Sequence, residues 1–139
     1  MASYNKINDF VQDIGEEVHD LASDQLVVAL TNTAVVATNG QLSDLTSVIV
    51  NTNLGGAGAF DITTTSWTNT SGTSKLILAD LTLTATGSAG PFRYIAIYND
   101  DAANDELIGW YDYGSSVTLT SSDTFTLNFD GSAGVLTIT

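Results

Sequence analysis

The sequence predicts a mainly-β protein, an antiparallel β-sandwich or jelly roll preceded by a short N-terminal helix or arm. Two observations carry this prediction. From residue 25 onward, short segments rich in aliphatic, aromatic and Thr residues alternate with turn signals of Gly, Asn, Asp and Ser. Before that point, apolar residues recur at the spacing of a helix.

The N-terminal segment carries one apolar stripe with steps of three and four residues and one single step. Its members are Ile7, Phe10, Val11, Ile14, Val18 and Leu21. We expect a short helix over about 4–14, because Gly15 costs about 1 kcal/mol in a helix interior. The stretch 16–21 either continues this helix or is already extended. We therefore divide the chain into an N-terminal amphipathic helix or arm (1–21) and a single β domain (22–139).

The β domain opens with the apolar run 26–30, which predicts a buried strand. Residues 42–50 are a weaker strand candidate, and 51–60 form a Gly-rich loop that suggests mobility or close approach to a neighbour. Further strands are predicted at 62–67, 75–85, 92–98, 107–113, 117–119, 124–129 and 135–138, with a turn over 69–74. Within 75–85 one face is predicted to hold Ile77, Ala79, Leu81 and Leu83; in the later strand, Phe125, Leu127 and Phe129 share a face.

Composition limits the classes of partner. The chain has 139 residues, enough for one domain, and no Cys, which excludes disulfides and thiolate metal sites. It carries 16 acids and three bases, a net charge of −13, so neither nucleic acid nor an anionic membrane surface is expected as a partner. No apolar run approaches the ~20 residues that cross a bilayer or forms a signal peptide. We expect a soluble protein made in a cytoplasm.

Reactive groups are scarce. His19 is the only His, and the sequence has neither a Gly-x-Ser-x-Gly elbow nor a Cys nucleophile. The glycines of 55–58 are not followed by the Lys-Ser or Lys-Thr of a phosphate loop. We therefore expect neither an enzyme nor a cofactor, and we expect His19 at the surface or in an interface.

Two clusters allow a binding function. The loop carboxylates Asp100, Asp101, Asp105 and Glu106 are weak candidates for a Ca²⁺ site, but the Asp-x-Asp-x-Asp-Gly spacing is missing, which favours a solvated connection. The aromatic residues Trp67, Trp110, Tyr111 and Tyr113 are candidates for a glycan platform. The favoured alternative places Trp110 in the core and Tyr111 and Tyr113 on the opposite, wetter face of one strand.

The N-terminal helix is too short to be stable alone, so its stripe must pack on its own domain or on a partner. For contact with a partner, the candidate residues are Tyr4, Ile7, Phe10, Val11 and Ile14. Docking within the same chain is the alternative, since either surface satisfies the stripe.

Four segments resemble small virion proteins of tailed bacteriophages. They are 18–33 (VHDLASDQLVVALTNT), 90–100 (GPFRYIAIYND), 107–119 (LIGWYDYGSSVTL) and 125–131 (FTLNFDG). The resemblance covers most of the chain outside 51–74. It implies a non-catalytic virion protein, most like a capsid decoration (cement) protein that binds the major capsid protein on the outer shell. The resemblance offers no catalytic motif.

The resemblance also implies a homo-oligomer, commonly a trimer. Three copies would carry three times −13, or −39, so the subunit interface must be predominantly apolar or bind divalent cations. A tail, neck or fibre-attachment protein of the virion is the alternative, and a carbohydrate-binding adhesion module is a third.

Overall fold

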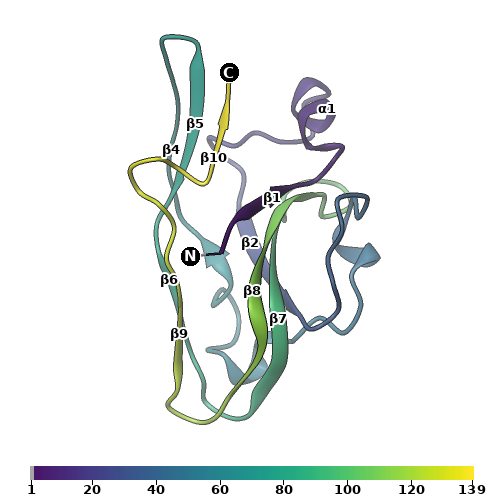
Figure 1. Cartoon of the computed structure of the whole chain (residues 1–139), viewed down its shortest axis with the longest axis vertical. Coiled ribbons are helices and arrows are strands. Elements are labelled where there is room, and N and C mark those ends of the chain that lie inside the picture. The colour runs from purple at the N-terminus through teal and green to yellow at the C-terminus, as the bar shows by residue number, and fades with distance from the viewer. Residues whose placement is uncertain (1) are drawn as a thin grey trace.

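The computed structural model describes residues 2–139 and confirms the mainly-β, antiparallel class with one short α-helix near the N-terminus (Figure 1). Strands make up 45% of the chain and helices 9%. The strands are β1 (Tyr4–Lys6), β2 (Leu26–Thr31), β3 (Asp61–Ile62), β4 (Thr64–Thr70), β5 (Thr73–Leu78), β6 (Leu81–Thr84), β7 (Ala89–Asn99), β8 (Leu107–Leu119), β9 (Thr124–Leu127) and β10 (Leu136–Ile138). The helices are α1 (Phe10–Gly15) and the 3₁₀ helices η1 (Leu42–Asp44) and η2 (Asn51–Asn53).

The first layer is a five-stranded sheet in the order β1-β8-β7-β2-β3. Its centre is the pairing of β2 with β7, which runs without a shift from Leu26 opposite Asn99 to Thr31 opposite Tyr94. All six residues of β2 are buried. This explains why β2 is a continuous apolar run rather than an alternating one, since both of its faces are covered.

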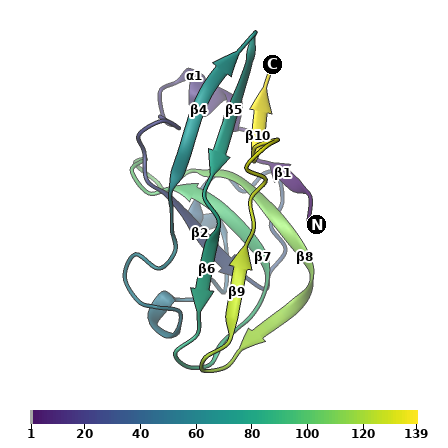
Figure 2. The same cartoon turned by 90° about the vertical axis from the view of Figure 1, so that its left-hand side faces the viewer.

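The second layer consists of a three-stranded sheet, β10-β5-β4, and a two-stranded sheet, β6-β9. In Figure 2, β5 runs on into β6 and β9 runs on towards β10, so the two pieces form one long layer. Phe92 of β7 meets Phe125 of β9 edge to face, with ring centroids 5.1 Å apart, and so joins the two layers. The main core lies between them, in a sandwich-like arrangement.

The predicted strand over 75–85 is two strands, and the predicted face is correct only in the second. Leu76 and Leu78 are buried in β5, whereas Leu83 and Ala85 are buried at β6, so the inward face changes phase at 79–80. Asp80 explains the break, because its Oδ1 accepts the backbone N–H of Phe129 at 2.8 Å. This hydrogen bond lies where the chain passes from β5 in the three-stranded sheet to β6 in the two-stranded sheet.

The weaker strand candidate, 42–50, is also wrong. Residues 42–44 form η1, and only Val48 makes an isolated bridge, to Thr31. The carboxylate of Asp44 accepts the backbone N–H groups of Gly40 and Gln41, at 2.8 and 3.1 Å, and this favours a turn. In the Gly-rich loop, Leu54 and Phe60 are buried, so the loop is anchored in the core.

The helix predicted over 4–14 begins later than expected. Residues 4–6 are β1, which pairs with β8 at 109–111, and α1 covers only Phe10–Gly15. The reason lies in β8: the ring of Tyr4 lies on Gly109, where any Cβ would overlap it. A glycine more than one hundred residues away thus decides the conformation of the N-terminal strand.

Replacing Phe129, which is 6% exposed, with Ala should lower the free energy of unfolding by about 3–5 kcal/mol. Phe125→Ala should cost less, because that ring is only half-buried. Urea denaturation measures both values, with the exposed Thr124→Ala as the control. A cost near zero for Phe129→Ala would contradict the packing of the second layer.

Gly109→Ala should displace the ring of Tyr4 and destabilise the protein by about 1–3 kcal/mol, as overpacking does. Gly131→Ala is the matched control, because a Cβ at Gly131 meets nothing within 4 Å. Thermal unfolding of the two variants provides the comparison. Equal melting temperatures would show that Tyr4 does not need the glycine.

Candidate functional site

The N-terminal segment packs on its own chain. Ile7 and Phe10 are 0% and 1% exposed and belong to the main core, together with Leu21. Tyr4 and Ile14 are half-buried against the same core, and only Val11 is well exposed, at 49%. The described conformation therefore realises the alternative of docking within the chain.

This placement corrects the expectation for Ile7 and Phe10 as partner contacts, because burial in their own core leaves no surface to share. Ile7, Phe10 and Leu21 of the predicted arm share one core with residues of the predicted β domain. Val11 and Tyr4 keep exposed surface; for them, contact with a partner stays a prediction.

The side chain of Asn99, at the end of β7, holds the segment in place. Its Nδ2 donates to the carbonyl of Val18 (3.2 Å) and to Oδ2 of Asp24 (2.6 Å), and it lies 3.2 Å from Nδ1 of His19. Its Oδ1 accepts the N–H of Asp101 at 3.0 Å, which fixes the orientation of the amide. Because an amide nitrogen is a donor and not an acceptor, this contact favours the neutral ring with its proton on Nε2.

His19 is buried, which corrects the expected surface position. Its Nε2 makes no hydrogen bond, and Oδ2 of Asp13 lies 3.8 Å away. Burial lowers the pKa of His19 below its ordinary value of 6.5, although the carboxylates of Glu106 and Asp24 act in the opposite direction. The neutral ring therefore has a structural role, packing 5.7 Å from the ring of Phe10 between centroids.

Two of the four carboxylates proposed as a weak Ca²⁺ site accept hydrogen bonds from neighbouring N–H groups. Asp101 accepts the N–H of Gln25 at 2.7 Å, and Glu106 accepts the side-chain amide of Asn104 at 2.7 Å. Asp105 has a positive φ of 53°, and burial raises the pKa of its carboxyl group, while Asp100 is exposed. Within residues 2–139, no group of three or more His, Asp or Glu side chains has metal-binding geometry.

A second acidic cluster comes from three separate segments (9–13, 44 and 106) and was missed in the sequence. Asp9, Asp13, Asp44 and Glu106 line a polar hollow of about 280 Å³. Burial, with the charges of Asp9, Glu106 and Glu16, raises the pKa of Asp13. The spacing of these acids along the chain gives no signal, because only the fold brings them together.

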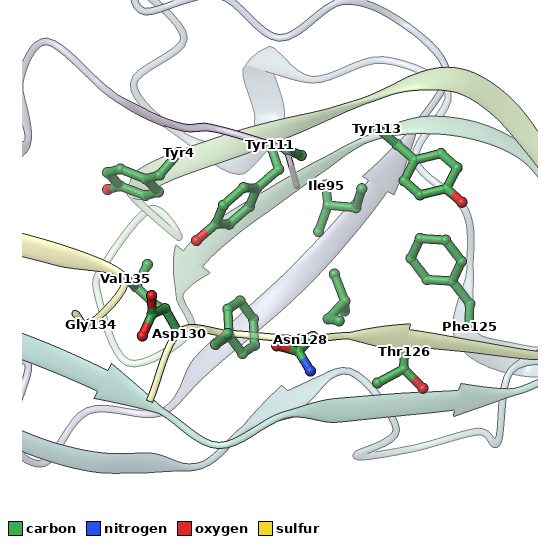
Figure 3. Close-up of a pocket in the computed structure, with 13 residues that line it drawn as sticks. Tyr4, Ile95, Tyr111, Tyr113, Phe125, Thr126, Asn128, Asp130, Gly134 and Val135 are labelled. Atoms are coloured by element: carbon green, nitrogen blue, oxygen red, sulfur yellow. The ribbon is translucent and has the colours of Figure 1, made fainter. Parts of the chain in front are cut away.

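An aromatic groove of about 390 Å³ lies between the two layers (Figure 3). Its upper wall holds Tyr111 and Tyr113 of β8 beside Tyr4 of β1, and Phe125 of β9 lies in the lower wall. Phe129 also lines the groove. The other lining residues are Ala2, Ile95, Thr126, Leu127, Asn128, Asp130, Gly134 and Val135.

The rings of the groove are packed in pairs. Tyr113 meets Phe125 with centroids 5.3 Å apart, and Tyr111 meets Phe129 at 6.3 Å. Burial raises the pKa of Tyr111 to about 12, so its hydroxyl, which Figure 3 shows directed towards the lower wall, stays protonated. Tyr113 is 52% exposed and marks the open end.

An ion pair fixes the β7–β8 hairpin beside the groove. Arg93 binds Asp112 with two hydrogen bonds, at 2.7 and 2.8 Å, and its guanidinium holds the pKa of Asp112 below the ordinary range. Next to this ion pair, Tyr94 pairs with Asp112, whereas Phe92 pairs with Val117. Because β8 has more residues than β7 between these two pairs, it bulges over 113–116. The bulge begins at Tyr113, which occupies the end of the groove.

The four aromatic residues considered for a glycan platform do not share one surface. Tyr111 and Tyr113 line the groove on the inner side of their sheet, not on a wetter outer face. Trp67 of β4 lines a hollow with Ile14 and His19, and Trp110 is half-buried, not fully in the core. The groove instead adds Phe125 and Phe129, which the sequence predicted on one face of a single strand.

Comparisons with family models, with curated proteins and with solved structures found no match to this chain. Among residues 2–139, the structure contains no helix with the length and hydropathy needed to cross a membrane.

The neutral state of His19 predicts a pH dependence. The unfolded chain binds a proton near pH 6.5 and the folded chain does so only at lower pH, so stability falls as pH drops below 6.5. The loss is at most about 1.4 kcal/mol per pH unit. His19→Gln keeps an acceptor but does not titrate, so its urea midpoint should vary less between about pH 7.5 and pH 5. The raised pKa of Asp13 has the opposite effect and remains in the variant.

Proposed function

We propose that the protein is a non-catalytic structural protein of a tailed-bacteriophage virion, a capsid decoration protein that binds the major capsid protein on the outer shell. The resemblance of four segments to small virion proteins supports this assignment. The observation that carries it is the open aromatic groove, since clustered aromatic rings are the side chains that dominate protein interfaces.

The side chains fit a protein that acts through contact. Many acids serve turns: Asp123 accepts from Thr120, and Asp130 accepts the N–H groups of Ser132 and Ala133. These N–H groups hold the pKa of Asp130 below its ordinary range, so Asp130 gives the groove lining one negative charge. A partner segment with a large apolar side chain and basic neighbours would complement it.

The energetic logic of a decoration protein follows from mass action. A protein that binds only the assembled shell shifts the equilibrium towards the intact particle. The net charge of −13 opposes non-specific association of free copies. On this view Tyr4 contributes to attachment from within the groove, which Ala2 also lines.

Adding the purified protein to capsids that lack it tests the proposal. Tyr113→Ser should weaken binding at least about tenfold, because it removes an exposed ring of the groove. Val50→Ser is the matched control, since Val50 is 72% exposed and lies outside the groove. Equal binding of both variants would exclude the groove, and failure of the unaltered protein to bind would exclude the shell as its partner.

The alternatives give different outcomes in the same system. A tail, neck or fibre-attachment protein would appear in a few copies at one vertex in an image reconstruction of the particle. An adhesion module would leave the shell bare and bind glycans through the groove, whose lining includes the polar side chains of Thr126 and Asn128.

A further inference from the structure

The outer edge of β4 is free. β4 is the last strand in the order β10-β5-β4, and only β5 pairs with it. Within residues 2–139, no backbone hydrogen bond joins 64–70 to any segment other than β5. The β4–β5 hairpin projects from the body of the molecule at its turn (Figures 1 and 2), and residues 68–70 of β4 are exposed.

Other strand edges carry the features that prevent edge-to-edge pairing. β1 and β3 have only three and two residues and include Lys6 and Asp61. β9 has four residues and follows Asp123, and β8 bulges beyond the end of β1. By contrast, the stretch 66–70 of β4 has no charge, no proline and no bulge, and such an edge is a template for another strand.

The hairpin also avoids the repulsion that opposes self-association. The stretch 62–79 contains no acidic residue and one base, Lys75. Two copies with a net charge of −13 each can approach most readily where neither presents a carboxylate. The charge distribution therefore favours a second copy of this chain as the occupant of the edge.

The turn fixes which backbone groups face outward. Ser71 and Gly72 form a two-residue loop with φ values of 52° and 88°, so Thr70 and Thr73 are a hydrogen-bonded pair. Bonded and non-bonded pairs alternate along an antiparallel ladder. Thr68 is thus bonded to β5, whereas the N–H and C=O groups of Trp67 and Asn69 point away from it.

We propose that β4 pairs antiparallel with β4 of a second copy about a two-fold axis at Thr68. Trp67 of one protomer then lies opposite Asn69 of its partner. In this register the outward N–H and C=O groups of Trp67 and Asn69 are hydrogen-bonded in both protomers. The regular stretch 66–70 matches itself in this register. Shifting the axis to Trp67 would place Asn69 opposite the bulge between Thr64 and Ser66.

The result is a continuous sheet through both protomers, an isologous contact. One strand pair buries less than the roughly 1,600 Å² of a standard interface, so we expect a reversible dimer. This pairing is independent of attachment to a shell. It differs from the trimer that the resemblance implies.

Disulfide trapping tests the register, because the chain has no Cys. Thr68 is exposed and would face Thr68 of the partner in a non-hydrogen-bonded pair, at a Cα separation of about 4.5 Å that a disulfide can bridge. Thr68→Cys should form a covalent dimer on mild oxidation. Thr84→Cys, exposed in β6 of the same layer, should not.

Sedimentation of the Cys-free protein provides the second measurement. The unaltered protein and the control Thr84→Lys should dimerise as concentration rises, whereas Thr68→Lys should remain monomeric with an unchanged melting temperature. A monomer at every concentration, an oligomer that Thr68→Lys does not disrupt, or equal trapping at both cysteines would each overturn the proposal. Attachment to capsids is measured separately and does not enter these outcomes.

Discussion

The structure depends on the uninterrupted pairing of β2 with β7. It places a fully buried six-residue strand at the centre of the first layer, with β8 on the other side of β7. In β7, the ring of Phe92 packs against Phe125 of the second layer, and the side chain of Asn99 donates a hydrogen bond to the carbonyl of Val18 in the N-terminal segment. The chain has no disulfide to replace this contact, so its burial and hydrogen bonds must hold both layers together.

The N-terminal segment illustrates how a local pattern and a tertiary contact compete. Its apolar residues do form a stripe in the sequence, but Ile7 and Phe10 are buried in the core of their own chain. The amide of Asn99 then donates to the carbonyl of Val18 and contacts the ring of His19, which holds the segment in place. The segment is therefore a component of the fold, and its removal would expose the core.

The acidic side chains and the contact surfaces are largely separate. Several carboxylates are engaged in bonds within the fold. Asp101 and Asp130 accept backbone N–H groups, and Asp112 binds Arg93. The aromatic groove and the β4 edge are poor in acids by comparison. A protein with a net charge of −13 can use such surfaces for association, because they combine apolar or unpaired backbone groups with little repulsion.

The sequence by itself determined the mainly-β class, the buried strand at 26–30 and the turn around Ser71 and Gly72, because alternation, apolar runs and turn residues report local conformation. Only the tertiary structure decided that 4–6 are a strand, that the inward face changes phase at Asp80, and that the aromatic groove exists. Each depends on a partner distant in the chain: Gly109 for Tyr4, Phe129 for Asp80, and β8 against β9 for the groove. Local sequence patterns do not report contacts between such distant residues. These contacts form only when the two layers pack together.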